Sequence, residues 1–394
     1  MTASIPAQFP PPPGGRVDIL LVAGEHSGDE HAARIVSTIL RHRPDLRISA
    51  LGGPALRDAG AQLLFDMTTS SAVGLVEVLA HLPFYRKVFL RALDWVRAHR
   101  PRLVCLVDYP GFNLRFAERL RACGLSRQGG GGVSVCYYVS PQIWAWKSRR
   151  RFRMARCLDG LGTIFPFEPD CYADTTLPVR YVGHPFATPP LRPAFRYDRD
   201  APVLLLPGSR PKAVCKIFPI LLDTWARFLP SHPARTACVI HPGDPVESLL
   251  REQLSRMPKT LADTITLLPR SAPMPLPASA AIGSSGTMSL KTALAGIPGA
   301  IVYRANPLTW WFGRRLVRGV SYLGIANILL RRPAWPEFLQ TDADPDLLAA
   351  RLHTCLASPE TALAAQNDAA ELHELLAPPS ATGTPADWLL ENLP

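Results

Sequence analysis

The stretch DILLVAGEHSGDEH, residues 18–31, indicates how the rest of the chain folds. Ile19–Val22 is a continuous apolar run of β-favouring residues, which is typical of a strand buried on both faces. The run ends at Gly24, and Ser27 with Glu30 three residues later forms a capping-box pattern that predicts the start of a helix. A strand that breaks at glycine before a helix is typical of open α/β sheets, whose ligands bind beyond the carboxyl ends of the strands.

The polar residues of this turn are expected to face a ligand rather than the core; they are Glu25, His26, Ser27 and Asp29. Their spacing does not match the glycine pattern of dinucleotide-binding turns, and two carboxylates would repel a pyrophosphate. A sugar or another polyol suits them better, because carboxylates accept hydrogen bonds from hydroxyl groups. An ordinary strand-to-helix turn remains the alternative.

Length and composition predict a globular protein of two domains. The chain has 394 residues, is 47% hydrophobic and carries a net charge of +11. This charge favours anionic partners, although no known nucleic-acid-binding motif accompanies it. Eight cysteines without CxxC spacing argue against a zinc site or a disulfide framework. No apolar run reaches the roughly 20 residues that span a bilayer, and the proline-rich residues 1–16 are expected to be a flexible leader.

Two more turns in the first half carry candidate site residues. Residues 102–107 form a predicted strand that ends at Asp108, a candidate general base held by Pro110 and Gly111. A role as a turn acid or helix cap is the alternative. The next predicted strand, 133–139, leads to Trp144 and Trp146, which are interpreted as an apolar platform for a sugar. The cations of residues 148–153 would attract phosphate or form a solvated helix face.

The second half repeats the alternation of strands and helices. Residues 203–206 form a predicted strand before the turn Pro207–Arg210, whose cation could meet phosphate at a helix start. Further strands are expected at 237–241 and 264–268. The small-residue loop 284–290 would then allow a diphosphate to approach the backbone closely.

These patterns predict an α/β fold of two Rossmann-like domains that face a cleft. The expected segments are a leader at 1–16, domains at 17–187 and 201–343, a linker at 188–200, and a helical segment at 344–394. Aromatic and basic residues gather on a predicted helix within 306–317, which fits a membrane interface or a domain-packing helix. The residues expected at that interface are Trp310, Trp311, Phe312, Arg314 and Arg315.

The chain resembles the lipid-A-disaccharide synthase family, which are inverting glycosyltransferases of the two-domain GT-B architecture. The resemblance covers residues 18–355 and rests on long motifs in a fixed order. They are AGEHSGD (23–29), GLVEVL (74–79), VDYPGFN (107–113), YVSPQIWAWKSRR (138–150), FPFE (165–168), VGHP (182–185), LLPGSR (205–210), SSGTMSL (284–290), Asn327 and PEFLQ (336–340).

The resemblance implies a reaction between UDP-2,3-diacylglucosamine and 2,3-diacylglucosamine 1-phosphate (lipid X), which gives the β-1',6-linked disaccharide 1-phosphate and UDP. It implies no metal or other cofactor and a peripheral position on the cytoplasmic face of the inner membrane. It also implies C-terminal helices that can cross back to the N-terminal domain, and a homodimer is one expected assembly.

The resemblance also assigns roles to individual residues. Asp108 would deprotonate the acceptor 6-hydroxyl, and Glu25 matches a required acid. Arg210 would neutralise the departing diphosphate, which the loop Ser285, Gly286 and Thr287 would hold. Asn327 and Gln340 match polar residues near the donor, and Ser140 and Trp144 lie in a motif expected to bind substrate.

The chain departs from the family pattern at three acidic positions. Lys291 stands where the family usually has a glutamate that accepts hydrogen bonds from ribose, and lysine has no acceptor. Ala213 and Gly111 replace two further acids. These departures leave two alternatives to the disaccharide synthase: a glycosyltransferase with another nucleotide-sugar donor, or a non-catalytic lipid- or nucleotide-binding paralogue.

Overall fold

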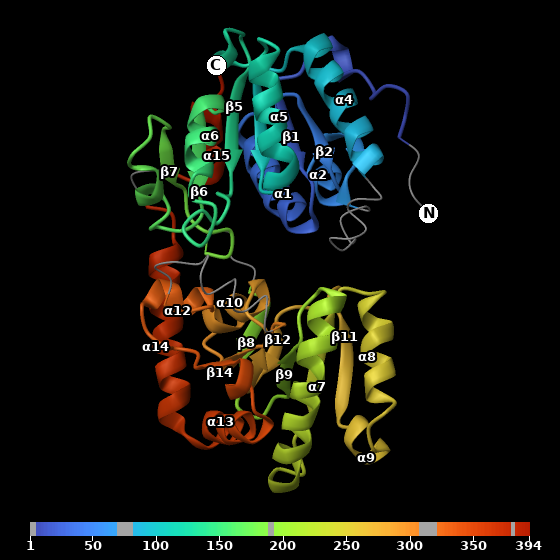
Figure 1. Ribbon diagram of the computed structural model, residues 1–394, viewed down its shortest axis with the longest axis vertical. Helices are drawn as coiled ribbons and strands as arrows, with labels where there is room; N and C mark the ends of the chain where they lie inside the picture. The colour runs from blue at the N-terminus through green and yellow to red at the C-terminus, as the bar shows by residue number, and fades with distance from the viewer. Residues whose placement is uncertain (1–4, 69–81, 188–192, 307–320, 380–382) are drawn as a thin grey trace. The chain divides into compact units, whose positions relative to one another are not determined.

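The computed structural model describes residues 5–68, 82–187, 193–306, 321–379 and 383–394 (Figure 1). The chain divides into two compact units. Unit 1 comprises Met1–Thr188 with Leu376–Pro394, and unit 2 comprises Pro189–Leu375. Each unit is built on a parallel sheet with helices between its strands, so the predicted class of two Rossmann-like domains is confirmed.

Unit 1 contains a seven-stranded parallel sheet in the order β3-β2-β1-β4-β5-β6-β7. The strand order reverses between β1 and β4, which are direct neighbours. The elements are β1 (Ile19–Ala23), α1 (His26–His42), β2 (Ile48–Gly52), α2 (Pro54–Asp58), β3 (Gln62–Asp66), α4 (Leu82–His99), β4 (Leu103–Val107), α5 (Pro110–Ala122), β5 (Ser134–Tyr138), α6 (Arg150–Cys157), β6 (Gly160–Thr163), β7 (Val179–Tyr181) and α15 (Pro385–Glu391).

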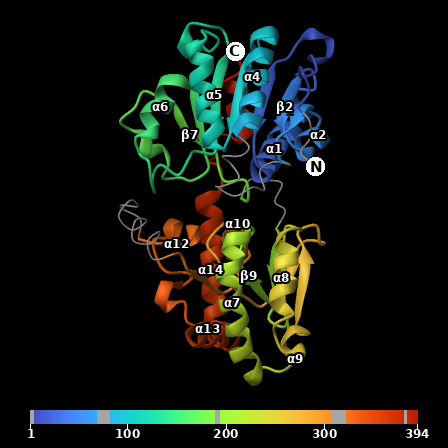
Figure 2. The same ribbon diagram turned by 45° about the vertical axis from the view of Figure 1, so that its right-hand side comes forward.

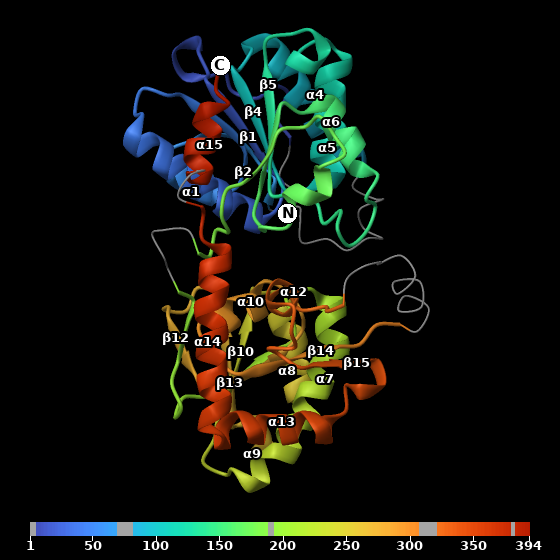
Figure 3. The ribbon, with the colours of Figure 1, turned by 90° about the vertical axis from the view of Figure 1, so that its left-hand side faces the viewer.

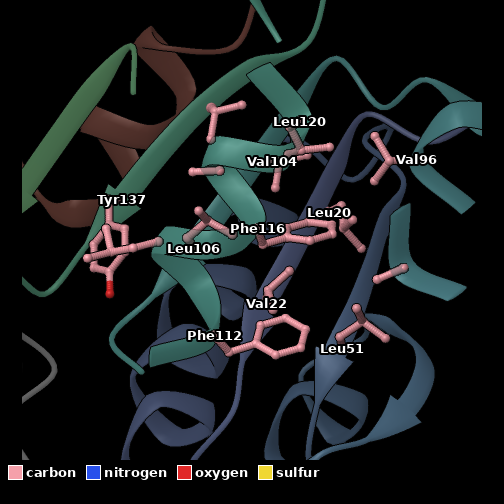
Figure 4. Packing of buried hydrophobic residues seen from close by; sticks show 14 of the residues in the cluster. Leu20, Val22, Leu51, Val96, Val104, Leu106, Phe112, Phe116, Leu120 and Tyr137 are labelled. Carbon is pink, nitrogen blue, oxygen red and sulfur yellow. The ribbon is translucent and has the colours of Figure 1, made fainter. Parts of the chain in front are cut away.

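The core of unit 1 lies between this sheet and its covering helices (Figure 4). Every residue of β1 and of β4 is buried, as their continuous apolar sequences predict. Helix α5 places Phe112, Phe116 and Leu120 on one face because they are spaced four residues apart. Burial of such side chains contributes about 1.5–3 kcal/mol each, so this packing fixes how the strand ends are placed.

The first helix begins earlier than its capping-box pattern predicts. Helix α1 starts at His26, and Ser27 lies inside it rather than at the N-cap. The prediction that Asp29 faces a ligand is also wrong, because this side chain is buried and receives the backbone N–H groups of Gly53, Ala55 and Leu56. Asp29 therefore caps helix α2, an interaction with residues more than 20 positions away that the local pattern cannot reveal.

The described part of the expected leader, residues 5–16, packs on unit 1 instead of standing free. Phe9 is buried and stacks on Phe65 with ring centroids 6.0 Å apart. The Trp95 indole donates to the carbonyl of Pro10 at 2.9 Å. The high proline content of this segment predicts a flexible leader, but the single aromatic side chain of Phe9 is enough to anchor it to the core.

Unit 2 contains a six-stranded parallel sheet in the order β11-β10-β9-β13-β14-β15. Its strand order reverses between β9 and β13, which are direct neighbours. Helices α7 and α8 pack side by side (Figure 2). The elements are β8 (Phe195–Tyr197), β9 (Val203–Leu206), α7 (Pro211–Phe228), β10 (Ala237–His241), α8 (Val246–Leu254), α9 (Lys259–Ala262), β11 (Ile265–Pro269), β12 (Leu276–Ala278), β13 (Ala280–Gly283), α10 (Thr287–Leu294), β14 (Gly299–Tyr303), α12 (Ile325–Leu330), β15 (Glu337–Leu339), α13 (Pro345–Ala357) and α14 (Pro359–Leu376).

The described part of the expected linker, residues 193–200, contains a strand. Strand β8 lies within it and pairs in parallel with β12 as a separate two-stranded sheet. Phe195 at the start of β8 is almost fully buried. This buried aromatic residue explains why part of a proline-rich segment is anchored to unit 2.

The C-terminal end of the chain returns to unit 1, as the fold expectation included. Helix α15 packs beside α1 (Figure 3), and the indole of Trp388 contacts Gly162 of β6. Arg180 of β7 and Glu391 of α15 form an ion pair of 2.6 Å, which also ties α15 to unit 1. Across the described residues, no helix has the length and apolar character needed to cross a membrane.

Candidate functional site

The two predicted acids of unit 1 lie at the point where the strand order of its sheet reverses. Glu25 follows β1 and Asp108 follows β4, and the last residues of these strands, Ala23 and Val107, are paired. Both acids are half-buried. In open parallel sheets this edge, at the reversal of strand order, is where ligands bind. The fold therefore brings together two carboxylates that are 83 positions apart in sequence.

The backbone at Asp108 is held in an uncommon conformation. Asp108 and Tyr109 both have φ of 48°, a left-handed region that non-glycine residues seldom adopt. Helix α5 begins at Pro110, so Pro110 and Gly111 open a helix instead of forming the turn expected from sequence. Backbone strain of this kind persists only where surrounding contacts impose it, and it gathers at functional sites.

Two buried side chains impose this conformation by bonding the Asp108 carbonyl. Asn113 Nδ2 donates to it at 2.7 Å, and the Tyr137 hydroxyl donates to it at 2.5 Å. Asn113 Nδ2 also reaches the carbonyls of Val22 and Val107, so one amide joins the ends of β1 and β4. The Asp108 main chain is thus fixed at the end of β4, and the residue is half-buried there.

Gly24 is required because the ring of Tyr109 crosses over it. A Cβ atom at Gly24 would lie 2.2 Å from Tyr109 Cδ1. Burial raises the pKa of the Tyr109 hydroxyl, and the neighbouring Tyr85 and Glu25 add to this effect. The phenol therefore stays protonated at neutral pH beside Glu25.

Glu168 is a buried acid at this edge to which sequence reasoning gave no role. Its Oε2 accepts the backbone N–H groups of Ile164 and Phe165 at 3.1 and 3.0 Å. Burial raises the pKa of Glu168 to about 8, those two hydrogen bonds oppose the rise, and the charge of Asp108 adds to it. Its position in the FPFE motif was the available signal, but the burial that makes it unusual depends on the tertiary fold.

Trp144 and Ser140 lie in the loop after β5, and both face the interior. The Trp144 indole lies close enough to Glu168 to lower that pKa, yet its geometry falls short of a hydrogen bond. Its Nε1 is therefore buried without a partner among the described residues. Ser140 Oγ is buried and lies 2.8 Å from the Tyr172 hydroxyl.

In unit 2 the two predicted phosphate-binding turns lie side by side. The turn Pro207–Arg210 follows β9 and the loop 284–287 follows β13, and the Ser284 N–H bonds the Leu206 carbonyl. Arg210 and Thr287 are exposed at the starts of α7 and α10. Two helix N-termini and one cation at a single sheet edge form an electropositive site suited to phosphate.

A chain of hydrogen bonds connects the loop 284–287 to residues 323–337. Ser285 Oγ donates to the carbonyl of Leu323 at 2.8 Å, and Glu337 accepts the N–H groups of Leu323 and Gly324. Asn327 is fully buried and donates to Glu337 at 2.9 Å. Gln340 Oε1 accepts the Ala305 N–H at 2.7 Å. Sequence reasoning did not give Glu337 a role, although it lies in the PEFLQ motif.

Some expectations fall on residues that lie outside the described ones. The GLVEVL motif at 74–79 and the expected membrane-contact residues Trp310, Trp311, Phe312, Arg314 and Arg315 are among them. Over the described ranges, no group of three or more His, Cys, Asp or Glu side chains is placed to hold a metal ion.

Solved structures with similar folds define the class of the protein. A putative UDP-N-acetylglucosamine 2-epimerase from Listeria monocytogenes superposes with a TM-score of 0.60 at 10% identity, covering 95% of each chain. The glycosyltransferase of kitacinnamycin superposes with a TM-score of 0.57 at 12% identity, covering 96% of this chain and all of the other. The fold is therefore that of GT-B glycosyltransferases and their relatives.

Sequence comparisons identify the family within this class. The model of the lipid-A-disaccharide synthetase family matches residues 19–381. Lipid-A-disaccharide synthase from Geobacter sulfurreducens is 35% identical over 86% of this chain and 88% of its own length. Lipid-A-disaccharide synthase 1 from Legionella pneumophila is 33% identical over 95% and 97%. The chain belongs to the lipid-A-disaccharide synthetase family, the hexosyltransferases of lipid A biosynthesis.

Proposed function

We propose that the protein transfers a 2,3-diacylglucosamine unit from its UDP donor to the 6-hydroxyl of 2,3-diacylglucosamine 1-phosphate. Asp108 takes the proton of the acceptor hydroxyl as its oxygen attacks the anomeric carbon. The bond between that carbon and the diphosphate breaks, and UDP leaves with the electron pair. A single displacement of this kind inverts the anomeric centre and gives the β-linked disaccharide.

The observation that carries this proposal is that the predicted residues of each unit gather where its strand order reverses. Glu25 and Asp108 do so in unit 1, and Arg210 and the loop 284–287 do so in unit 2. Carboxylates suit a sugar hydroxyl, and helix N-termini with a cation suit a leaving diphosphate. The separation of acid and phosphate sites between units fits an acceptor in unit 1 and a donor in unit 2.

Other predicted site residues take supporting roles in this proposal. Asn327 donates to Glu337, and Glu337 accepts the N–H groups of Leu323 and Gly324. Ser285 in turn donates to the Leu323 carbonyl. Gln340 ties β15 to the segment after β14. Because these side chains are hydrogen-bonded within unit 2, they would position the loop that binds the donor and would not contact the donor themselves.

The variant Asp108→Asn tests the role of the base. Asparagine tolerates a positive φ, so the fold should persist while disaccharide formation falls by about 10²–10⁴-fold. Product formation from the two acylated substrates is followed by mass spectrometry. Asp94→Asn, an exposed acid on α4 paired with Arg97, is the matched control and should keep full activity. Loss of less than tenfold in Asp108→Asn would reject Asp108 as the base.

The proposed donor carries UDP, so the nucleotide preference of the protein tests this part of the proposal. Lys291 makes the test necessary, because it stands where the family usually has a glutamate that binds ribose. Lys291 lies one turn after Thr287 on α10, so both belong to the face that begins at the phosphate loop. UDP should raise the thermal midpoint of the protein more than TDP or GDP does. Greater stabilisation by another nucleoside diphosphate would favour a different nucleotide-sugar donor.

The proposed place of action is the cytoplasmic face of the inner membrane, where acylated substrates reside. The aromatic and basic residues of 310–315 would provide the contact. Replacing Trp310, Trp311 and Phe312 with serine should weaken binding to anionic liposomes in a flotation assay. Unchanged flotation would remove this segment from the membrane contact.

A further inference from the structure

Trp146 is an exposed aromatic residue with cations held against its ring. Its side chain is 44% exposed. Lys147 Nζ lies 4.4 Å from the ring centroid, and Arg150 Cζ lies 5.2 Å from it. Both distances are within the range of cation–π attraction, which restrains the two long side chains. We call Trp146, Lys147, Arg149 and Arg150 the Trp146 cluster.

The charge of this cluster is not neutralised, whereas the next arginines along the chain are paired. Arg151 makes two bonds of 2.6 Å to Asp174, and Arg153 makes two of 2.8 Å to Glu118. Throughout the described part of the chain, no carboxylate forms an ion pair with Lys147, Arg149 or Arg150. The cluster therefore presents positive charge to an external anion.

The position of the cluster connects it to Asp108. It spans the loop that follows β5 and the first residue of α6, and β5 is the neighbour of β4 in the sheet. The Tyr137 hydroxyl bonds the Asp108 carbonyl, and burial raises the pKa of this hydroxyl. The charge of Arg150 opposes that rise, so Arg150 acts on the same hydroxyl that holds the Asp108 carbonyl.

We propose that Lys147 and Arg150, oriented by Trp146, bind the phosphomonoester of the acceptor sugar. This inference rests on the proposed function, which places the acceptor at Asp108. The acceptor carries its reacting hydroxyl on C6 and its phosphate on C1, at different ends of one sugar ring. A cationic site beside Asp108 would fix the far end of the ring and aim the 6-hydroxyl at the carboxylate. Such fixation reduces the entropy cost of the transfer.

The kinetic test compares the acceptor with and without its phosphate. Lys147→Gln and Arg150→Gln are assayed in detergent micelles with 2,3-diacylglucosamine 1-phosphate and with 2,3-diacylglucosamine. Each variant should lose about tenfold or more in kcat/KM for the phosphorylated acceptor, mainly through KM, because a charge-assisted bond is removed. The unphosphorylated acceptor should react equally with wild type and variants. Arg153→Gln, a paired arginine on the same helix, is the control and should behave as wild type.

A binding measurement separates failure of this inference from failure of the proposed function. Calorimetric titration with glucosamine 1-phosphate requires no turnover, and both variants should bind it at least about tenfold more weakly than wild type and Arg153→Gln do. Tight binding with no disaccharide product would overturn the function and keep the phosphate site. Normal product formation with unchanged binding and kinetics in both variants would overturn the phosphate site alone.

A lipid headgroup offers the same phosphate chemistry, and a third measurement distinguishes it. The variants are floated with phosphatidylglycerol vesicles. Weakened flotation together with unchanged micellar kinetics would assign the cluster to the membrane surface and overturn the acceptor site. Unchanged flotation with the selective kinetic loss supports it.

Discussion

Asn113 Nδ2 donates a hydrogen bond of 2.7 Å to the backbone carbonyl of Asp108, five residues earlier. The same nitrogen bonds the carbonyls of Val22, the penultimate residue of β1, and Val107, the last residue of β4. Asn113 is fully buried on the first turn of α5. The helix that packs on the sheet thus also sets the strained turn that presents the acid.

Replacing Asn113 with leucine should therefore lower both stability and turnover. The three carbonyls would lose a buried donor, which costs roughly 1–3 kcal/mol of unfolding free energy. The Asp108 turn would relax, so kcat should fall more than donor affinity does. Urea unfolding and steady-state kinetics measure the two effects.

Tyr137→Phe removes the other bond to the Asp108 carbonyl and completes a double-mutant cycle. Because both side chains hold one oxygen atom, the losses in kcat should be non-additive. Strictly additive losses would show that the two residues act on separate features.

Gly24→Ala should disturb the same turn from the opposite side. A methyl group 2.2 Å from the Tyr109 ring must displace that ring, and Tyr109 adjoins Asp108. We expect at least a tenfold loss of kcat together with a lower melting temperature. Gly111→Ala is the matched control, because a Cβ there meets no atom within 4 Å and its helical position favours alanine. Equal behaviour of the two variants would contradict the packing argument.

The sequence predicted the sheets well for a physical reason. Runs such as Ile19–Val22 and Val203–Leu206 are buried on both faces of a parallel sheet, so they must be continuously apolar. The acids and glycines that follow these runs lie at the carboxyl ends of the strands, which is the edge where open parallel sheets bind ligands. Strand β8 carries no such pattern, because it has three residues and pairs outside the main sheet.

What the sequence did not predict depends on contacts between distant positions. Asp29 has the local pattern of a turn acid, but its partners are at Gly53–Leu56. Glu168 is an unremarkable glutamate until tertiary packing removes it from water. Asn327 is predicted to lie near the donor, but only the fold shows that its amide is engaged with Trp335 and Glu337.

Glu168→Gln should change how stability depends on pH. The Glu168 pKa is about 8 in the folded protein against an ordinary value of 4.5, so the folded state holds one more proton between these pH values. Wild-type stability should therefore fall as pH rises through this window, by at most about 1.4 kcal/mol per pH unit from this group. Glutamine keeps an oxygen for the Ile164 and Phe165 N–H groups and cannot ionise, so its advantage over wild type should grow from pH 5 to 8 and then level off.

Urea titrations at each pH measure this difference. Glu118→Gln is the control, since Arg153 holds the pKa of the Glu118 carboxyl below its ordinary value and this group therefore titrates below the tested range. The stability difference between Glu118→Gln and wild type should stay constant from pH 5 to 8. A stability difference between Glu168→Gln and wild type that is the same at pH 5 and pH 8 would show that Glu168 does not titrate in this range.

Arg210→Gln should weaken the electrostatic support of the leaving diphosphate. Arg210 lies exposed at the start of α7, next to the loop after β13, so its loss removes the cation but not the helix N-termini. We expect kcat/KM for the donor to fall by about 10²–10³-fold, and UDP should stabilise the variant less in a thermal-shift assay. Arg227→Gln near the other end of α7, where Arg227 pairs with Asp346, should leave both quantities unchanged. If the two arginine variants lost donor affinity equally, the effect would stem from net charge, and the turn after β9 would no longer be assigned to the diphosphate.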